Sequence, residues 1–298
     1  MTETSLSWDY YRSFLQVVET GSLSAAAANL GLTQPTLGRH ISALEKAIGV
    51  TLFVRSQNGF APTEEALRLI PFSRSIEANA AAFLREATAR EGVMAGTVRI
   101  SASEIVGSEV LPPILAKLHQ AHPGLSIELI LSNAAEDLSS READIAVRMF
   151  PPTQKALISK KVGEAEIGLH AHKSYLKRRG TPATWAELAK HSLICFDKEN
   201  EYLRKYMKLM PSLNRGSFQF RSDSDIAQVA AIRAGFGIGF CQTILVKNQK
   251  DIVRVMPSEV NFTFGAWVVM PEDLRNSPRC KIVFNALCDG LGAILKRR

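Results

Sequence analysis

Four polar side chains that can pair with nucleic-acid bases stand close together: Gln34, Thr36, Arg39 and His40. The amide of glutamine can make two hydrogen bonds to the edge of adenine, and arginine can pair with guanine or with a phosphate. The apolar residues among them recur at helical spacing, at Leu37, Ile41, Leu44 and Ile48. The polar side chains are therefore predicted to lie on the outer face of a helix, where they can contact DNA.

We expect the DNA-binding residues to be Thr33, Gln34, Pro35, Thr36, Arg39, His40 and Arg55. Gln34 and Thr36 are expected near bases or adjacent phosphates, and Arg55 on the phosphate backbone. For Arg39 and His40 the alternative is an ordinary solvated helix face. For Arg55 it is a helix-capping role or a salt bridge between helices.

The elements that must hold these side chains form a winged helix-turn-helix over residues 1–62. A first helix is predicted over 8–20, with Gly21 ending it and Ser22 capping the next. Residues 22–49 form two helices around a turn at 31–33, where Thr33 caps the second helix and Pro35 suits its first turn. Residues 50–55 and 60–62 pair as a hairpin around Asn58-Gly59. The second helix of such a module enters the major groove.

A long alanine-rich helix is predicted over residues 63–91. An apolar stripe at helical spacing runs along it: Leu69, Phe72, Ile76, Ala80, Phe83 and Ala87. Pro71 is expected to kink the helix or delay its start. No core is available to an isolated helix, so we expect it to pack against a second copy of itself. The alternative is a solvated spacer.

Net charge does not by itself indicate DNA binding. The chain of 298 residues carries a formal charge of +7. In residues 1–62, however, the cations Arg12, Arg39, Lys46 and Arg55 are matched by Glu3, Asp9, Glu19 and Glu45. The positive surplus lies downstream, partly in the terminal 296–298, so the helix-turn-helix must bind by geometry and a few well-placed cations.

Residues 92–298 alternate predicted strands and helices, which is typical of a parallel α/β sheet. The strands are too many for one small sheet, so we expect two halves with a cleft. Segments 97–103, 125–132, 143–148 and 193–196 read as strands, 109–121 as a helix, 158–170 as an interrupted extended stretch, and 278–295 as a closing helix. Ligands bind beyond the carboxyl ends of such strands. The residues there are Ser101, Ser103, Ser132, Asn133, Arg148, Cys195 and Phe196.

These residues predict an effector that is a small organic acid or amino-acid-like anion. Hydroxyls beside helix N-termini favour an anion, and Arg148 can pair with a carboxylate. Each has a plainer alternative: Ser132-Asn133 as a turn, Arg148 in a salt bridge and Cys195 in the core.

Several other functions are disfavoured. No signal peptide or long apolar run is evident, which predicts a cytoplasmic protein without a membrane partner. The four scattered cysteines favour reduced buried thiols, and we expect no metal and no cofactor. The glycines of 235–239 follow a helix and open a strand, the reverse of a dinucleotide fingerprint. His170 and His172 are expected in a loop at a strand end. No catalytic motif is present, so we expect no enzyme.

The N-terminal residues resemble LysR-type transcriptional regulators. The matching positions are Phe14, Gly21-Ser22, Ala26-Ala27, Leu30, Thr33-Gln34-Pro35, Ile41, Leu44-Glu45, Gly49, Leu52-Phe53-Val54-Arg55 and Thr63. Residues 96–100, Leu111-Pro112, His122-Pro123, 143–146 and 235–238 also fall where the family's effector domain has equivalents. Two residues depart from the pattern: Gly38 replaces a usual serine, and Ala66 replaces a common glycine.

The resemblance implies an α+β multidomain fold. A winged helix-turn-helix (1–62) and a linker helix (63–91) precede a two-subdomain effector domain like a periplasmic binding protein (92–298). Its subdomain I spans about 92–165 and 266–298, and subdomain II about 166–265. The implied partners are a pseudo-palindromic operator in double-stranded DNA, a small effector near Ser103 and Ser132, a dimer or tetramer of the chain, and RNA polymerase. The alternatives are a solute-binding protein and a nucleoid-type DNA binder without effector.

Overall fold

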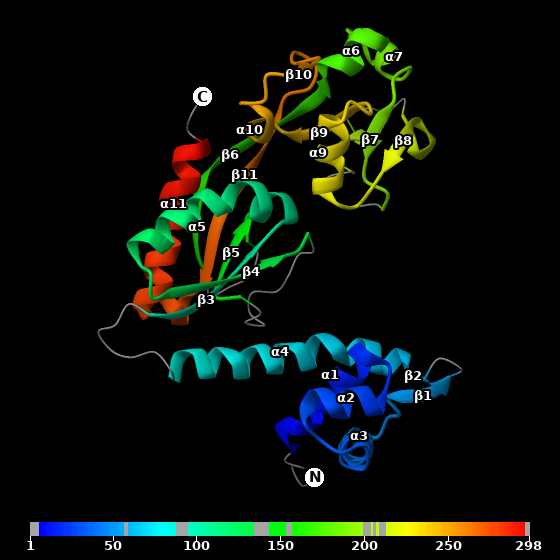
Figure 1. The fold of residues 1–298 in the computed structure, drawn as a ribbon, viewed down its shortest axis with the longest axis vertical. Helices are drawn as coiled ribbons and strands as arrows, with labels where there is room; N and C mark the ends of the chain where they lie inside the picture. The colour runs from blue at the N-terminus through cyan, green and yellow to red at the C-terminus, as the bar shows by residue number, and fades with distance from the viewer. Residues whose placement is uncertain are drawn as a thin grey trace. The chain divides into compact units, whose positions relative to one another are not determined.

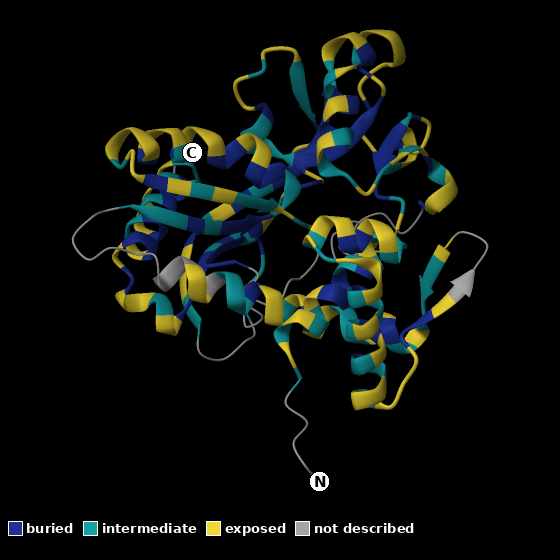
Figure 2. Ribbon diagram, turned by 60° about the horizontal axis from the view of Figure 1, so that its bottom comes forward, coloured by how far each residue is buried: buried dark blue, intermediate teal, exposed yellow. Residues whose placement is uncertain are grey.

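The protein is described from a computed structural model, which covers residues 6–56, 59–87, 95–133, 143–152, 157–198, 204, 207–208 and 213–295. By contacts the chain divides into two compact units, with the boundary between Ala89 and Arg90. Each unit has its own apolar core (Figures 1 and 2). No described helix is long and apolar enough to cross a membrane.

The first unit is a helix-turn-helix followed by a hairpin. Its elements are α1 (Trp8–Thr20), α2 (Leu23–Leu30), α3 (Gln34–Ile48), β1 (Phe53–Ser56), β2 (Gly59–Pro62) and α4 (Glu64–Ala87). Side-chain oxygens of Ser7, Ser22 and Thr33 cap the first three helices, as N-cap residues do. Their C-caps Gly21, Gly31 and Gly49 are left-handed, with φ of 62°, 65° and 75°. The predicted turn, caps and hairpin are confirmed.

Two hydrogen bonds hold the hairpin against the helices, one between backbone groups and one to a side chain. The Phe60 N–H donates to the Gly21 carbonyl at 2.9 Å, and a Cβ on Gly59 would lie 2.6 Å from that same oxygen. The carboxylate of Glu45, near the end of α3, accepts from the Leu52 N–H at 2.7 Å. Gly59 and Glu45 therefore fix the position of the hairpin, which is the wing of the winged helix-turn-helix.

Helix α4 begins at Glu64 behind the capping hydroxyl of Thr63, which accepts from the Ala66 N–H at 3.1 Å. It contains Pro71 and continues for 24 residues, so the proline does not delay its start. Ala66 is fully buried against the first core. Three stripe residues are exposed: Phe72 by 69%, Ile76 by 38% and Phe83 by 71%.

The second unit is built on one nine-stranded sheet, in the order β4-β3-β5-β11-β6-β9-β7-β8 with β10 beside β6. Its strands are β3 (Gly96–Ala102), β4 (Leu125–Leu131), β5 (Ile145–Arg148), β6 (Leu157–His172), β7 (Leu193–Cys195), β8 (Phe218–Arg221), β9 (Ile238–Gln242), β10 (Ile252–Val255) and β11 (Phe262–Pro271). The helices are η1 (Val106–Val110), α5 (Leu111–Ala121), α6 (Lys173–Arg179), α7 (Trp185–Leu188), η3 (Arg215–Ser217), α9 (Asp225–Arg233), α10 (Thr243–Val246), η4 (Glu272–Asn276) and α11 (Pro278–Leu295).

The expectation of a parallel sheet is only partly right. Strands β3, β4 and β5 are parallel, as are β7, β8 and β9. The long strands β6 and β11 join these two halves and run antiparallel to their neighbours. The ribbon in Figure 1 shows them passing from one half into the other. Alternation of strand and helix identified the halves but not the strands that they share.

Three further expectations need correction. The stretch called interrupted is one continuous strand of 16 residues, β6. His170 and His172 lie on that strand rather than in a loop. His170 pairs with Gly239 of β9 and Arg254 of β10, and His172 pairs with Ile252 of β10. The helix expected over 109–121 is preceded by a π-helical turn, Val106–Val110, before α5 begins at Leu111. The alternation of strands and helices also predicts helices over 135–141 and 200–210, and these segments lie wholly or largely outside the described residues.

Glycine 38 provides a test of the helix-turn-helix. A Cβ at Gly38 would meet no atom within 4 Å, and the residue is in the middle of α3. Gly38→Ala should therefore stabilise α3 by about 1 kcal/mol, because alanine loses less backbone entropy in a helix. Hydrogen exchange of the α3 amides in the full chain measures this.

Gly49→Ala is the matched control for Gly38→Ala. A Cβ at Gly49 also meets open space, but its φ of 75° is strained for alanine. It should destabilise the end of α3 by about 1 kcal/mol. Equal effects of the two substitutions would contradict the left-handed cap.

Candidate DNA-reading helix and effector pocket

The outer face of α3 is polar and exposed at its first turn. Gln34, Pro35 and Arg39 are exposed, whereas Leu37 and Ile41 on the opposite side are buried. The Thr33 hydroxyl accepts from the Thr36 N–H at 3.4 Å and lies 2.9 Å from the Thr36 hydroxyl. Capping thus also orders the first polar side chains of the predicted reading face.

Arg39 lies along the same face. Its Nη2 donates to the Thr36 hydroxyl at 3.2 Å, one helical turn before it. A guanidinium has five N–H donors, so this single bond orients the group and leaves donors for another partner. The structure therefore brings Thr33, Thr36 and Arg39 together at the exposed start of α3.

His40 is directed towards α1 instead. Its Nδ1 lies 2.9 Å from the hydroxyl of Ser13, which is fully buried, and its ring is 5.3 Å from the ring of Tyr10. These contacts fix α3 against α1. The sequence signal that sequence analysis missed is Ser13, a polar residue next to the buried Phe14. The backbone of Arg55 pairs with Phe60 on the wing, and its side chain lies outside the described residues.

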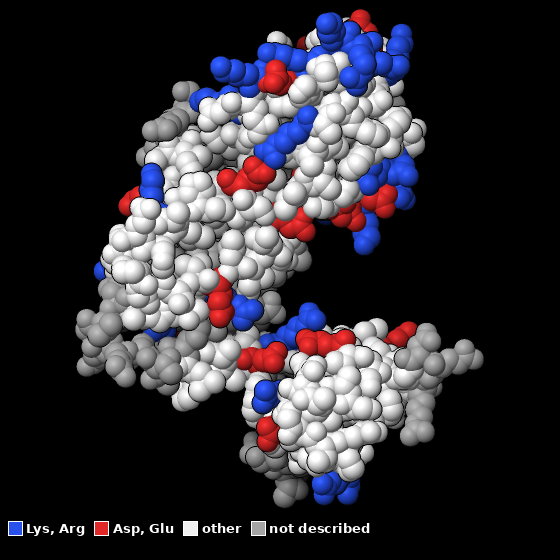
Figure 3. Space-filling view, in the orientation of Figure 1, with Lys and Arg blue, Asp and Glu red and all other residues white. Residues whose placement is uncertain are grey.

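Lysines and arginines do not gather on the reading helix. Figure 3 shows the first unit mostly in white, with blue side chains concentrated over α6 and α7 of the second unit. Helix α6 carries Lys177, Arg178 and Arg179 in its last turn, all exposed. The positive surplus thus lies on the second unit, as the residue count indicated.

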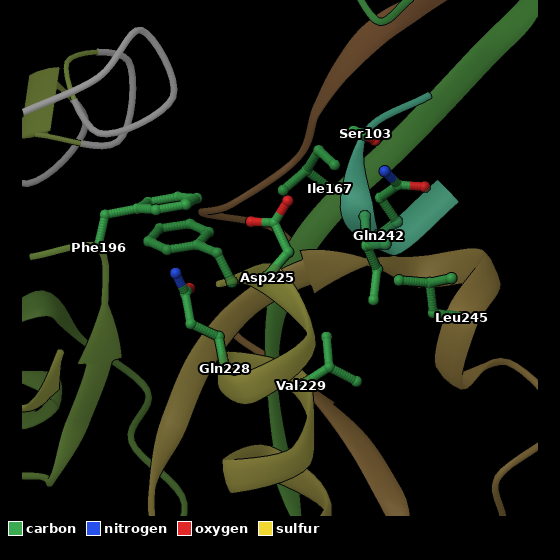
Figure 4. Close-up of a pocket in the computed structure, with 10 residues that line it drawn as sticks. Ser103, Ile167, Phe196, Asp225, Gln228, Val229, Gln242 and Leu245 are labelled. Carbon is green, nitrogen blue, oxygen red and sulfur yellow. The ribbon is translucent and has the colours of Figure 1, made fainter. Parts of the chain in front are cut away.

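A pocket opens between the two halves of the second unit, at the carboxyl ends of strands (Figure 4). Its lining residues are Ser103, Ile105, Ile167, Phe196, Asp225, Gln228, Val229, Phe240, Gln242 and Leu245. The cavity volume is about 40 Å³. One water requires about 10–15 Å³ measured in this way, so the pocket is small.

Two larger hollows exist, but they lack this arrangement. One of about 610 Å³ runs along α5 and α11, and one of about 800 Å³ lies beside β6 and α10. The small pocket is the one at the switch point between the two halves, where α/β sheets bind ligands. It also has polar groups converging from both halves, so we take it as the candidate effector site.

Two of the seven predicted effector residues, Ser103 and Phe196, line this pocket. Arg148 donates to the Ser101 hydroxyl from Nη1 at 3.3 Å and from Nη2 at 3.2 Å, and Ser101 is fully buried. The Ser132 N–H donates to the Ala102 carbonyl at 2.9 Å. These residues hold β3, β4 and β5 together, and the structure does not bring them to the pocket.

The remaining two predicted residues have structural contacts. The Asn133 side-chain oxygen accepts from the Glu104 N–H at 3.1 Å and so caps the turn after β3. Cys195 is buried in β7, and burial raises the pKa of its thiol to about 11. The thiol is therefore protonated at neutral pH.

Three polar residues of the pocket were not predicted from the sequence: Asp225, Gln228 and Gln242. Gln242 ends β9, and Asp225 follows the cap Ser224 at the start of α9. Gln242 is at the carboxyl end of a strand, where ligand contacts are expected. The Ser-Asp pair at 224–225 is a helix-start signal that points to Asp225.

Side chains from the two halves also bond directly to each other. The Ser224 hydroxyl donates to Glu104 Oε2 at 2.8 Å. Arg233 donates from both terminal nitrogens to the two oxygens of Glu109, at 2.8 and 2.9 Å. The hydrogen bonds from Arg233 hold the pKa of Glu109 below its usual range. The segment after β3 is thus fastened to α9 and its cap.

The fold and the two sites define a class of protein in which a DNA-binding module is combined with a ligand-binding unit. A helix-turn-helix with an exposed polar reading face is joined to an α/β unit with a ligand pocket between two halves. No cluster of three or more potential metal-binding side chains occurs among the described residues.

Comparison with known proteins identifies the family. Residues 8–67 match the family model "Bacterial regulatory helix-turn-helix protein, lysR family", and residues 91–291 match "LysR substrate binding domain". The chain belongs to the LysR family of transcriptional regulators. It is 28% identical to the regulator CrgA of Neisseria meningitidis, over 94% of this chain and 95% of CrgA. It is 25% identical to the transcriptional activator AaeR of Escherichia coli, over 93% and 91% of the two chains.

Solved structures agree with the fold. The regulator CbnR superposes with a TM-score of 0.68 at 17% identity, covering 97% of this chain and 99% of CbnR. The full-length virulence activator AphB of Vibrio cholerae gives 0.62 at 22% identity, covering 95% and 99%. The expected two-subdomain effector domain is confirmed.

The Glu109–Arg233 pair can be tested by Glu109→Gln. Both side chains are about 31% exposed, so we expect the bidentate pair to contribute about 1 kcal/mol and its loss to lower the unfolding temperature by a few degrees. Because the pKa of Glu109 is lowered in the folded state, its stabilisation is present above the ordinary value of 4.5 and is lost as the pH falls through the lowered pKa.

Thermal unfolding of both proteins at neutral and acidic pH measures the effect of Glu109→Gln. The unfolding temperatures should differ near neutral pH and converge in acid. Glu128→Gln is the control, because Glu128 forms an exposed pair with Arg99 at 3.7 Å that does not join the two halves. An equal effect of both substitutions would contradict a specific role for the link across the pocket.

Proposed function

We propose that this chain is a regulator, and not an enzyme, whose binding to a pseudo-palindromic operator is altered by a small molecule in the pocket between β3 and α9. One observation carries the proposal: the same chain has both an ordered, outward-facing polar surface on α3 and a pocket whose two walls are hydrogen-bonded to each other. A ligand that separates or tightens these walls changes the shape of the second unit. We propose RNA polymerase as a further partner and the cytoplasm as the location.

The proposal predicts a ligand-dependent footprint. The full chain should protect a pseudo-palindromic segment next to its own gene. Small metabolites that raise its unfolding temperature should change the length or the hypersensitive sites of that footprint. A footprint that no such ligand alters would contradict effector control. Equal affinity for unrelated DNA would favour the nucleoid-type alternative.

Arg39 is the side chain on which we expect sequence recognition to depend most. Arg39→Ala should weaken operator binding by about 10-fold or more, because a good contact to a base edge is worth about 1–3 kcal/mol. Lys46→Ala is the control, since it removes the same charge from an exposed position in the last turn of α3. Band-shift titrations on operator and scrambled DNA distinguish the two.

A base contact by Arg39 requires that Arg39→Ala lower the preference for operator over scrambled DNA. A uniform loss on both sequences would show that Arg39 contacts phosphate instead. Equal losses for Arg39→Ala and Lys46→Ala would contradict a reading role for the start of α3.

We propose that α4 pairs with α4 of a second copy, because a solvated spacer does not require so many exposed large apolar side chains. They are Leu67, Phe72, Ile76, Phe83 and Leu84. Phe72→Glu should place charge in that contact and shift the chain towards monomer in analytical ultracentrifugation. Arg74→Glu, a charge change on an exposed position of the same helix, is the control. A Phe72→Glu protein with unchanged mass in solution would contradict pairing through this stripe.

A further inference from the structure

The described lining of the pocket carries negative charge, from Asp225, and no positive charge. Its polar lining residues are Ser103, Asp225, Gln228 and Gln242, and its other lining residues are apolar. No lysine or arginine is among the residues described as lining it. The expected partner of an anion, Arg148, is bonded to Ser101 instead. Its described lining residues therefore include no cation that would recognise a carboxylate effector.

Asp225 is directed into the pocket by the start of α9. Figure 4 shows its carboxylate pointing between Phe196 and Ile167, away from the helix. No hydrogen bond or ion pair reaches this carboxylate from the described parts of the chain. An acid at a helix start interacts favourably with the helix dipole, but an exposed position would provide that without loss of solvent. The placement of Asp225 in a mostly apolar pocket therefore requires another reason.

Glu104 places a second carboxylate close to Asp225. One of its oxygens accepts from Ser224, and its charge acts on Asp225 across the pocket. The nearby cation, Arg233, is bonded to Glu109 and also donates from Nε to Gln249 at 3.2 Å. The negative charge of Asp225 and Glu104 is therefore not balanced by these protein groups.

We propose that the effector of this regulator carries a cationic amino group, which Asp225 binds at the base of the pocket. This inference rests on the proposed function, since it assigns the chemical class of the ligand at the same site. The amide of Gln242 and the hydroxyl of Ser103 are available to a polar, uncharged part of the ligand, whereas Nε2 of Gln228 already donates to the Ser222 carbonyl at 2.8 Å. The rings of Phe196 and Phe240 contact its hydrocarbon part. The small volume selects a short aliphatic amine over an aromatic acid.

The ionisation of Asp225 makes amine binding pH-dependent. Burial, and secondly the charge of Glu104, raise the pKa of Asp225 to about 6. Above this pH the carboxylate is ionised and attracts an ammonium group, and below it the proton removes that attraction. Affinity for an amine should therefore fall as the pH drops through 6. A ligand carboxylate that accepts a hydrogen bond from protonated Asp225 would show the opposite trend.

The test is calorimetric titration of the full chain with three probes of similar size: propylammonium, propionamide and propionate. The unmodified protein should bind propylammonium best, at neutral pH and more weakly below pH 6. Asp225→Asn should weaken propylammonium binding by about 10- to 100-fold, the usual range for a charge-assisted hydrogen bond. Asp251→Asn, which alters an exposed aspartate, is the control and should bind like the unmodified protein.

The outcomes separate this inference from the proposed function. Preference for propionate, or an Asp225→Asn protein that binds propylammonium as well as the unmodified one, would overturn the amine assignment and leave effector control intact. Ligands of any charge that bind but never alter the footprint would overturn the proposed function. If Asp225→Asn unfolds, the pH profile of the unmodified protein still decides, because rising amine affinity in acid overturns the assignment.

Discussion

The second unit depends on the antiparallel pairing of β6 with β11. Their register runs from Phe262 opposite Ile167 to Pro271 opposite Leu157, with an irregularity between Ala266 and Trp267. One end of this ladder carries the half with β3 and β5, and the other carries the half with β9 and β7. Because both halves share the same two strands, a movement of one relative to the other must bend or twist them. The pocket lies beside this hinge, with Ile167 of β6 in its wall.

The first unit depends on backbone geometry rather than on charge. Left-handed glycines end α1, α2 and α3, and Glu45 fixes the start of the wing. The reading face can then be nearly neutral, since few phosphate contacts are needed to orient a helix that is already held rigidly. His40 also contributes to this geometry, because its Nδ1 contacts the Ser13 hydroxyl and holds α3 against α1.

Local signals in the sequence predicted the first unit almost completely, because caps, glycines and apolar spacing each act within one helical turn. The shared strands were missed because pairing of β6 with β11 joins residues about a hundred positions apart, and no local pattern encodes it. Only part of the pocket was predicted, because it too is formed by residues that are far apart in the sequence. Ser103 and Phe196 follow strands that the apolar pattern of the sequence predicts. Asp225 instead lies in the first turn of a helix, α9, and reaches the pocket from there. Arg148 looked like a ligand contact, but it is bonded to Ser101 across neighbouring strands.

The most direct test of the account is hydrogen–deuterium exchange of the full chain, with and without a ligand that raises its unfolding temperature. The account predicts slower exchange in the segment after β3, at the start of α9 and where β9 passes into α10. These segments form the walls of the pocket between the two halves. Protection confined to the groove along α5 and α11, with these three segments unchanged, would contradict it.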